Sequence, residues 1–358
     1  MEISNFEVRK DDLFKSRVIS SAAPELNEGE VLAKVDRFAL TANNITYGIV
    51  GEKLGYWNFF PADAGWGIIP VWGFADIVET RSPDVKTGER LYGYFPMGTH
   101  LVMLPGKTTE ASLADMAKHR AALSPVYNFY IRISNKPTHD ASMDDERMLL
   151  MPLFATSFCL SDFLQDNNYF GAEQVIIPCA SSKTAIGLAY ALSASTVSQA
   201  CIGVTSTGNS ARVKALGIYD DVVTYDDLGS IDNSRASVIV DMSGNGRVLS
   251  DLHAHLGDNM KFTSNVGLTH FDANKMGPDF IHERSAMFFA PAHIKKRASE
   301  WGPGVFEERA QEFWYEGAKK SRDWLRIEHL KGMDALGGVF AELLHGKVSP
   351  DRGIIVSF

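Results

Sequence analysis

Short apolar runs separated by polar turns fill the chain from its N-terminus to about Leu104. GEVLAKVDRFAL, FADIVET, ERLYGYFP and THLVMLP alternate apolar with polar positions, and glycine or proline stands at or near their ends. Alternation with this punctuation is typical of strands that bury one face. The first region is therefore predicted to be a small β-rich domain, partly barrel-like.

The pattern changes at Val175. VIIPCASSKTAIGLAYAL (175–192) begins with a short apolar run, continues through small polar residues, and ends in a regular Ala/Leu/Ile-rich stretch. This order predicts a buried strand, a turn and a tightly packed helix. Further strands and helices follow, with strands at 222–225 (Val222 to Tyr225), VIVDMSG and MKFTSNVG. Such βαβ alternation predicts an α/β fold with a Rossmann-type, doubly wound parallel sheet.

The turn between that strand and helix is a candidate anion site. Free backbone N–H groups and the positive end of the helix dipole meet there, where a dinucleotide's pyrophosphate binds. Of the G-x-G-x-x-G fingerprint only Gly187, the glycine that lets helix and strand pack closely, is present. Ser182 and Thr184 occupy the first two positions, with Lys183 between them. The alternative is an ordinary strand-to-helix turn capped by Ser182 or Thr184.

The end of the next strand favours NADP(H) over NAD. NAD-binding units place an acid about 20 residues after the turn, but here Thr205, Ser206 and Thr207 occupy that place. Hydroxyls can donate to a 2′-phosphate, and Arg212 or Lys183 can neutralise it. The alternative is that Asn209 or Ser210 caps the helix that ends at Gly217, with Arg212 solvated.

Composition narrows the function classes. The chain has 358 residues, 45% hydrophobic and 22% charged, which suits two globular domains. Its formal net charge of −9 gives no support to nucleic-acid binding. No run approaches a membrane span and the N-terminus has no signal-like core, so we expect a cytoplasmic protein without a membrane partner. Cys159, Cys179 and Cys201 have no metal-like spacing and are expected to be buried thiols.

These segments together resemble the medium-chain dehydrogenase/reductase superfamily. GEVLAKVDRFALTANNITYGIVG is similar to its opening strand pair, VKTGERLYGY to its "dv-x-x-GdrV-x-g" turn, and MPLFATSF to the helix entering its nucleotide domain. ARVKALGIYDDVVTYDD, VIVDMSGN and ELLHGKVSPDRGIIVSF resemble later segments in the same order. The match is collinear over nearly the whole chain. The YWNFFP and PVWGFA runs further resemble an uncharacterised branch that carries a domain-of-unknown-function label.

The resemblance implies a domain organisation and a cofactor site. A GroES-like catalytic domain would comprise 1–150 and 290–358, and a Rossmann domain 151–289. The superfamily habit of joining nucleotide domains edge to edge implies a homodimer. The positions expected to bind the cofactor NADP(H) are Thr156, Ala180, Ser181, Ser182, Lys183, Thr184, Ala185, Ile186, Gly187, Thr205, Ser206, Asn209, Arg212, Ser243 and Gly244.

Zinc-dependent members of that superfamily hold a catalytic metal with a cysteine and a Gly-His-Glu segment. The matching places here read 39–42 (Ala-Leu-Thr-Ala) and 70–75 (Pro-Val-Trp-Gly-Phe-Ala), and three cysteines cannot make a four-cysteine lobe. His253 and His255 are two apart on a predicted helix, so they should diverge, and a solvated surface is expected there. We therefore predict no metal site.

In metal-free enoyl reductases of the superfamily a tyrosine is implicated as the proton donor. Tyr56 lies nearest the matching place, with Tyr47 as a second candidate and Asn44 as a group that can orient the substrate oxygen. A phenol can protonate or hydrogen-bond a developing enolate, although its ordinary pKa near 10 makes it a weak acid. The alternative is that both tyrosines are packing residues.

Aromatic residues crowd 56–74, which suggests a bulky apolar or aromatic small-molecule substrate. Residues 107–147 are expected to form a helix and a loop over the cleft. Arg120 can hold an anionic substrate end or pair with Asp115 or Glu110, and pairing is favoured.

Two functions remain. The first is an NADPH-dependent, zinc-independent oxidoreductase that reduces an activated C=C or C=O bond, and the second is a non-catalytic NADPH-binding sensor or scaffold.

Overall fold

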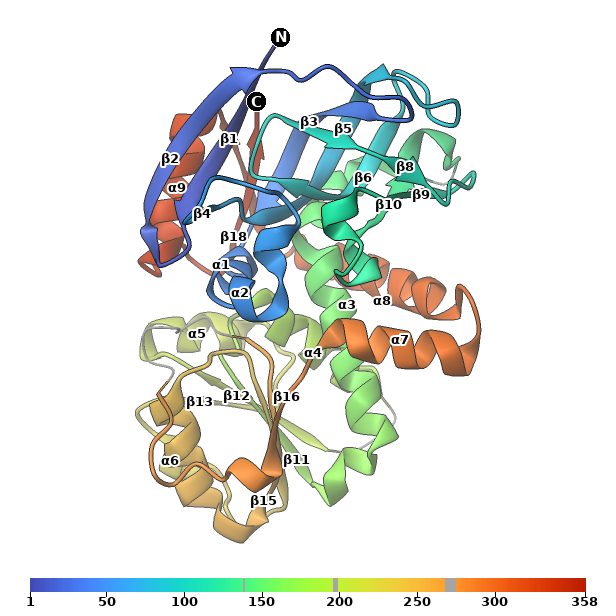
Figure 1. Ribbon diagram of the computed structural model, residues 1–358. Coiled ribbons are helices and arrows are strands. Elements are labelled where there is room, and N and C mark those ends of the chain that lie inside the picture. The colour runs from blue at the N-terminus through green and yellow to red at the C-terminus, as the bar shows by residue number, and fades with distance from the viewer. Residues whose placement is uncertain (138, 196–198, 268–274) are drawn as a thin grey trace. The chain divides into compact units, whose positions relative to one another are not determined.

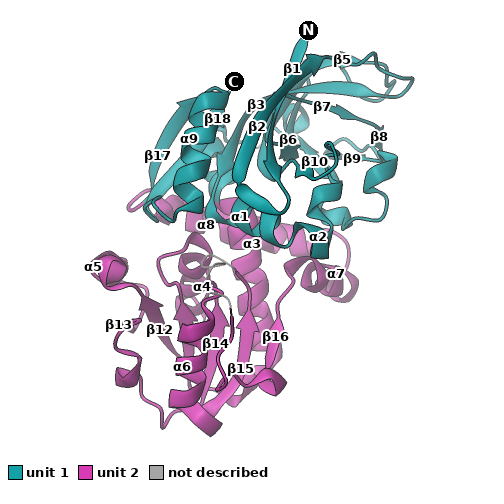
Figure 2. Cartoon of the chain, turned by 60° about the vertical axis from the view of Figure 1, so that its left-hand side comes forward, with its two compact units in different colours: residues 1–149, 325–358 teal, residues 150–324 magenta. Residues whose placement is uncertain are grey.

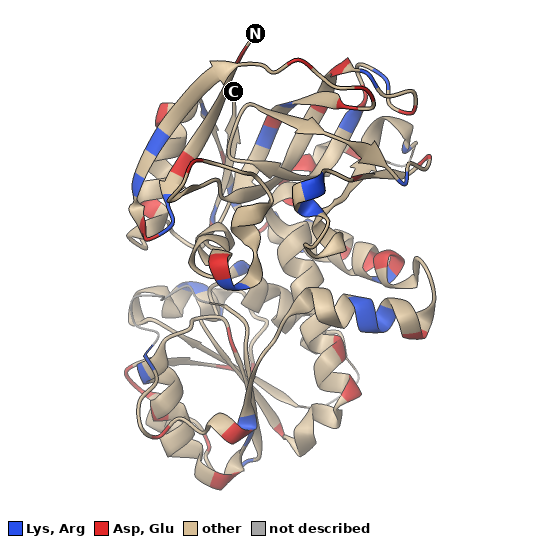
Figure 3. Ribbon diagram, in the orientation of Figure 1, with Lys and Arg blue, Asp and Glu red and all other residues tan. Residues whose placement is uncertain are grey.

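The structure is a computed structural model that describes residues 1–137, 139–195, 199–267 and 275–358. The chain divides into two compact units (Figure 2). Unit 1 comprises Met1–Leu149 and Leu325–Phe358, and unit 2 comprises Leu150–Trp324. In Figure 3 the basic and acidic positions are interspersed within each unit.

Unit 1 is β-rich, as the alternating runs predicted (Figure 1). Its strands are β1 (Glu2–Arg9), β2 (Asp12–Ala22), β3 (Val31–Leu40), β4 (Trp66–Gly67), β5 (Pro70–Thr80), β6 (Arg90–Pro96), β7 (His100–Met103), β8 (Pro105–Gly106), β9 (Ser112–Asp115), β10 (Phe129–Arg132), β17 (Arg326–Lys331) and β18 (Arg352–Ser357). They form a sheet β17-β18-β3-β5-β6-β10-β9-β8, with β7 paired to β3, and a smaller sheet β2-β1-β4. The pairing is antiparallel except between β17 and β18.

The helices of unit 1 are short. They are α1 (Ala42–Ile49), α2 (Gly51–Leu54), α9 (Met333–Leu344) and the 3-10 turns η1 (Tyr56–Asn58), η2 (Lys118–Arg120), η3 (Pro125–Tyr127), η4 (Ile133–Asn135) and η5 (Ala141–Met143). α9 follows β17 and is followed by β18, which is the crossover that parallel strands require.

The expectation of a helix and loop over 107–147 is wrong. This segment supplies β9, β10 and the four 3-10 turns η2 to η5, and β10 pairs with β6 through Ile131 and Tyr92. β6 would otherwise leave one edge unpaired, and the β-branched and aromatic residues of β10 suit a strand. Tyr130 lies against Gly93, where a Cβ atom would stand 2.3 Å from the tyrosine ring. The insertion therefore widens the sheet.

Unit 2 contains the predicted parallel sheet. Its strands are β11 (Gln174–Pro178), β12 (Ala200–Thr205), β13 (Asp221–Thr224), β14 (Ser237–Asp241), β15 (Met260–Asn265) and β16 (Ser285–Met287). They lie in the order β13-β12-β11-β14-β15-β16, and every pairing is parallel. The strand order reverses between β11 and β14. Doubly wound sheets bind their ligands beyond the carboxyl ends of the strands at such a reversal.

Helices cover both faces of this sheet. They are α3 (Asp144–Asp166), whose first residues belong to unit 1, and α4 (Lys183–Ser193), α5 (Thr207–Ala215), α6 (Gly246–Leu256), α7 (Ala290–Trp301) and α8 (Val305–Ser321), with the 3-10 turns η6 (Asn168–Gly171), η7 (Leu228–Ser230), η8 (Gly257–Asn259) and η10 (His282–Arg284). Val175 and Ile177 pack with Leu188 of α4, whereas Ile176 packs with Leu249 of α6. Successive residues of a strand face opposite sides, so both layers of helices are anchored, at about 1.5–3 kcal/mol for each fully buried side chain.

The predicted domain boundary at residue 290 is not where the two units divide. Helices α7 and α8 belong to unit 2. Their aromatic rings pack on α3, with Phe158 5.6 Å from Phe306 and 5.9 Å from Phe313, and Gly317 lies against Phe154. The amphipathic faces of the two helices are buried here, so the chain returns to unit 1 only at Leu325.

One segment differs from the expectation about membrane spans. Ala141–Asp166, which contains α3, is long and apolar enough to cross a bilayer by length and composition, with a mean hydropathy of 1.4 in its most apolar window. More than half of that window, 56%, is buried inside the protein. A buried core helix passes the same test, so the segment is weak support for a membrane span.

Candidate functional site

The turn between β11 and α4 has the geometry of an anion-binding loop. Cys179 adopts a left-handed conformation with φ 61°, so the sharp bend falls at this residue rather than at Ser182 or Thr184. Ser182 is the N-cap of α4, and its hydroxyl accepts from the N–H of Ala185 at 3.3 Å. The N-terminus of α4 therefore opens at the sheet's reversal point.

Several polar groups of this turn are already used. The N–H of Cys179 donates to the hydroxyl of Tyr225 at 3.1 Å, and the N–H of Ala180 donates to Val204. Tyr219 donates to the carbonyl of Ala180 at 2.8 Å. Neither tyrosine was identified as a site residue from the sequence. Their positions on both sides of strand β13 were the signal that could have identified them. They hold the turn in place and leave fewer N–H groups for a phosphate.

Gly187 packs closely, as predicted, but its partner is helix α3 rather than a strand. A Cβ atom there would lie 2.5 Å from the Ser157 hydroxyl and 2.8 Å from the Phe154 ring. The Ser157 hydroxyl donates to the carbonyl of Thr184 at 2.8 Å. The side chains of Ala185 and Ile186 are buried in the core, so these two predicted positions can face a cofactor only through their backbone.

The second candidate region lies at the start of α5. Thr205 is buried, Ser206 is the half-buried residue before the helix, and Arg212 is exposed. The side chain of Asn209 donates to the Ser181 hydroxyl at 3.5 Å, so the fold brings these two predicted residues together. Lys183 is half-buried in the first turn of α4.

A carboxylate that sequence reasoning missed lies beside this region. Asp226 follows β13, is exposed, and accepts from the hydroxyl of Thr207 at 3.1 Å. The acid that NAD-binding units carry at the end of the second strand is absent, but the neighbouring strand supplies one next to α5. No local motif marks Asp226, because the parallel pairing of β12 and β13 brings it there.

Ser243 and Gly244 form a turn held by a buried aspartate. Asp241 accepts from the N–H and the hydroxyl of Ser243 at 2.8 and 2.6 Å, and from the N–H of Gly244 at 2.8 Å. The Ser243 hydroxyl also accepts from the N–H of Asn245. Both predicted residues are thereby committed to the turn after β14. On α3, Thr156 donates to the carbonyl of Pro152 at 3.2 Å.

Burial raises the pKa of Asp241 to about 6, even though its hydrogen bonds to Ser243 and Gly244 act in the opposite direction. The folded state therefore binds a proton more tightly than the unfolded chain. The stability that this proton contributes is present below about pH 4 and is lost as the pH rises through 6.

Asp241→Asn should remove this dependence. The free energy of unfolding of the variant minus that of the wild type should rise by on the order of 3 kcal/mol between pH 4 and 7, since a tenfold change in acid dissociation corresponds to about 1.4 kcal/mol. Chemical denaturation at a series of pH values measures the difference. A difference that stays constant across this range would show that Asp241 remains ionised in the fold.

The predicted catalytic tyrosines lie in an aromatic cluster inside unit 1. Tyr47 and Tyr56 are 6% and 5% exposed, and their rings are 4.6 Å apart. The Tyr56 hydroxyl lies 2.9 Å from that of Tyr127, and Trp72 donates to the Tyr47 hydroxyl at 3.4 Å. The ring of Tyr94 lies 5.7 Å from that of Tyr47 and 4.7 Å from that of Tyr127. Most of the aromatic residues at 56–74 are thus core residues.

Burial raises the pKa of both Tyr47 and Tyr56 above the ordinary value for a phenol. Both hydroxyls are therefore neutral at physiological pH. In that form a phenol is a good hydrogen-bond donor and a poor proton donor. The arrangement suits stabilisation of a developing negative charge better than complete proton transfer.

Asn44 has a structural role. Its carbonyl oxygen accepts from the N–H of Thr41 at 2.7 Å, which completes a capping box at the start of α1, and its amide donates to the carbonyl of Pro70 at 2.8 Å. The side chain therefore ties α1 to β5. Its predicted contact with a substrate oxygen would require these bonds to change.

Arg120 pairs with Asp115, as favoured, at 2.7 Å. The expected solvated surface at the two histidines is wrong for His253, which is buried and bonded to Thr263 and to the N–H of Ile281. Its neighbours on α6 are apolar, and burial lowers its pKa to about 4. Within the described part of the chain, no group of three or more His, Cys, Asp or Glu side chains is placed to hold a metal ion.

Comparisons with known proteins identify the family and the fold of this chain. Residues 38–349 match the family model described as a protein of unknown function, DUF2855. Among curated proteins no match was found.

Solved structures resemble the chain over its full length. CurA from Vibrio vulnificus in complex with NADPH matches with a TM-score of 0.64 at 11% identity, covering 99% of this chain and 98% of that one. Mycobacterial Rv1454c complexed with NADPH matches with a TM-score of 0.62 at 11% identity over 99% and 100%. The complex of Etr1p with NADP and crotonyl-CoA matches with a TM-score of 0.59 at 12% identity over 100% of both chains.

At such low identity the likeness concerns the fold. The likeness covers both units, the largely antiparallel β-rich unit 1 and the six-stranded parallel sheet of unit 2. The chain belongs to the DUF2855 family and has the fold of the medium-chain dehydrogenases/reductases.

Proposed function

We propose that this protein is an NADPH-dependent, zinc-independent reductase of an activated C=C or C=O bond in a bulky apolar or aromatic small molecule. The observation that carries the proposal is the capped N-terminus of α4 at the reversal point of the parallel sheet, together with hydroxyls at the end of β12. The NADPH and NADP complexes of similarly folded proteins support it.

The residues present fit this cofactor. Ser181, Ser182, Lys183 and Thr184 would bind the pyrophosphate at the start of α4, through hydroxyls, a cation and the helix dipole. Ser206 and Arg212, with Asn209, would bind the 2′-phosphate. When bound, the nicotinamide supplies a hydride. In unit 1 a phenol would donate a hydrogen bond to the substrate oxygen as negative charge develops on it.

The preference for NADPH over NADH can be tested directly. Ser206→Glu should weaken NADPH binding by about 10–100-fold, because it replaces a donor to the phosphate by a carboxylate, and NADH binding should change little. Asp226→Ala should tighten NADPH binding, because it removes a neighbouring negative charge. Titration calorimetry with both nucleotides measures these changes.

Ser299→Glu is the matched control. It makes the same charge change at an exposed position on α7. Equal affinity of the wild type for NADPH and NADH, or an unchanged preference in Ser206→Glu, would remove the support for NADPH.

A non-catalytic NADPH-binding protein is the second candidate. It is favoured by the burial of Tyr47, Tyr56 and Tyr127 in a filled aromatic cluster. Crystals soaked with NADPH would separate the two functions. A nicotinamide ring facing an open aromatic cleft supports a reductase, and a ring facing packed side chains supports a sensor or scaffold.

We also propose that the protein is a homodimer. The sheet of unit 2 ends at strands β13 and β16, and open edges of a sheet favour pairing or cover. Light scattering at micromolar concentration should give twice the chain mass of 39.4 kDa. A monomer mass would contradict this proposal and leave the reductase proposal intact.

A further inference from the structure

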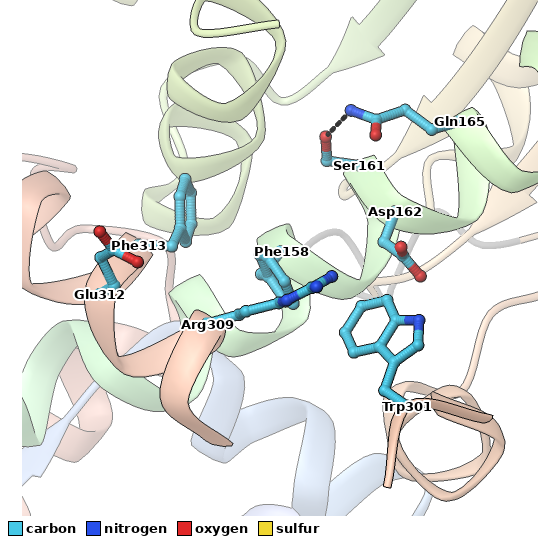
Figure 4. Close-up of a pocket in the computed structure, with 8 residues that line it drawn as sticks. All are labelled: Phe158, Ser161, Asp162, Gln165, Trp301, Arg309, Glu312 and Phe313. Atoms are coloured by element: carbon cyan, nitrogen blue, oxygen red, sulfur yellow. Dashed lines mark hydrogen bonds between the residues drawn. The ribbon is translucent and has the colours of Figure 1, made fainter. Parts of the chain in front are cut away.

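Unit 2 contains a pocket away from the turn after β11. It lies between helix α3 and the pair α7 and α8, and its volume is about 350 Å³ (Figure 4). That volume is at the small end of the range for small-molecule sites. The pocket shares no residue with the predicted cofactor positions. Its ligand would therefore bind independently of NADPH.

The walls of the pocket are aromatic. Phe158 of α3 lies 6.4 Å from Trp301 of α7 and 5.9 Å from Phe313 of α8, measured between ring centroids. The guanidinium of Arg309 lies over the Trp301 ring at 4.5 Å. Figure 4 shows Arg309 extended across the pocket between Phe158 and Trp301. Aromatic walls of this kind bind flat rings by stacking. The Trp301 ring also holds the Arg309 guanidinium where the edge of a stacked ligand ring would meet the guanidinium.

The polar groups offer both donors and acceptors. Asp162 accepts through Oδ2 from His293 at 2.6 Å and from Arg297 at 2.5 Å, which leaves Oδ1 as the oxygen for a ligand. His293 and Arg297 lower the pKa of Asp162 despite its partial burial, so its carboxylate is ionised at neutral pH. Arg309 is a donor, and Gln165, which donates to Ser161 at 3.4 Å, retains its carbonyl as an acceptor.

The charges of the pocket balance. Arg297 neutralises Asp162, and the exposed Glu312 and Arg309 carry opposite charges on neighbouring turns of α8. A strongly charged ligand would therefore meet a repelling group of its own sign. The balance favours a neutral ligand.

We propose that this pocket binds a neutral, planar nitrogen heterocycle whose edge carries an N–H donor next to an acceptor, as a purine base does. The ring would stack against Phe158 and Phe313, since Arg309 already covers the Trp301 ring. Its N–H would donate to Asp162, and its acceptor would receive a hydrogen bond from Arg309.

Adenine is the probe, measured by titration calorimetry on the full-length chain with saturating NADPH present. One saturable site is expected, with binding unchanged by NADPH. Caffeine, which keeps a purine ring system and its acceptors but has no N–H, should bind about tenfold more weakly, because a charge-assisted hydrogen bond to a carboxylate is lost.

Two variants test the site. Phe313→Ala should weaken adenine binding about tenfold or more through lost stacking, whereas Tyr315→Ala, which removes an aromatic ring from the same helix outside the pocket, should change it less than twofold. Arg309 is exposed, so Arg309→Gln should leave the fold intact while it weakens the binding of adenine.

Three outcomes would overturn the proposal. The first is no saturable binding up to about 5 mM adenine, which would place any dissociation constant above the millimolar range. The second is equal adenine binding by Phe313→Ala and the wild type. The third is displacement of adenine by NADPH. The last outcome would assign adenine to the cofactor turn and would support the proposed function. A protein that binds adenine normally but does not bind NADPH would contradict the proposed function and leave the proposed adenine site supported.

Discussion

Arg120→Met is expected to lower the free energy of unfolding of unit 1 by about 3–5 kcal/mol, because it leaves a buried carboxylate without its cation. Arg120 and Asp115 are 0% and 2% exposed. One guanidinium nitrogen donates to Asp115 at 2.7 Å and to the Tyr130 hydroxyl at 2.9 Å. The guanidinium also lies 5.2 Å from the rings of both Phe59 and Phe60. The residue thus joins the insertion to the aromatic cluster.

The double variant Asp115→Asn/Arg120→Met should recover most of this loss. Asp115 also accepts through Oδ1 from the N–H groups of Leu104 and Ala117, at 3.2 and 3.0 Å, and an asparagine carbonyl can keep both bonds without a buried charge. Two further nitrogens of Arg120, Nε and Nη2, are buried without a hydrogen-bond partner in the described structure, so the pair carries a desolvation cost that the double variant removes.

Urea denaturation followed by circular dichroism measures these changes. Lys15→Met is the control, because Lys15 pairs with Asp12 at 3.2 Å on the surface of the same unit, and such a pair contributes about 0–1 kcal/mol. A loss in Arg120→Met no larger than in the control would mean that the ion pair contributes little to the stability of the fold.

Tyr56→Phe is expected to reduce turnover by about 10²–10⁴-fold on a substrate that the wild type reduces, if its hydroxyl serves the developing charge on the substrate oxygen. The variant keeps the ring and therefore the contacts with Tyr47 and Phe59. It also removes one partner of the hydroxyl pair with Tyr127 at 2.9 Å, so a loss of about 1 kcal/mol in stability is expected beside the loss of turnover.

Tyr127→Phe and Tyr47→Phe are the matched controls. Tyr127→Phe breaks the same hydroxyl pair from the other side, so it should cost similar stability and a smaller loss of turnover. Stopped-flow oxidation of NADPH by each variant gives the rates. Full turnover in Tyr56→Phe with an impaired Tyr47→Phe would move the donor to Tyr47. Unchanged turnover in both would show that water delivers the proton and that the tyrosines are packing residues.

The local pattern of the sequence determined the elements of both units. Apolar runs with period two became β3, β5, β6 and β7, and the buried strand at Val175 with the small-residue helix after it became β11 and α4. These predictions succeed because burial and backbone period are properties of consecutive residues. The hydroxyls at the end of β12 were predictable for the same reason, whereas the partner of Gly187, helix α3, was not.

Tertiary structure alone decided which side chains meet. Asp226 reaches Thr207, and Tyr225 reaches Cys179, because β13, β12 and β11 are parallel neighbours. His253 is buried because Thr263 and Phe280 close over α6. Residues far apart in sequence make these contacts, and no single-sequence pattern records their pairing.

The same reason explains the burial of the candidate tyrosines. Tyr56 meets Tyr127 across 71 positions, since the insertion folds into β9 and β10 against β6 instead of forming a separate helix. The sequence by itself determined a parallel sheet in one unit and a β-rich architecture in the other. The tertiary structure decided the contacts of the phenols, of the buried Arg120 and of Asp226 beside α5, because long-range strand pairing sets those neighbours.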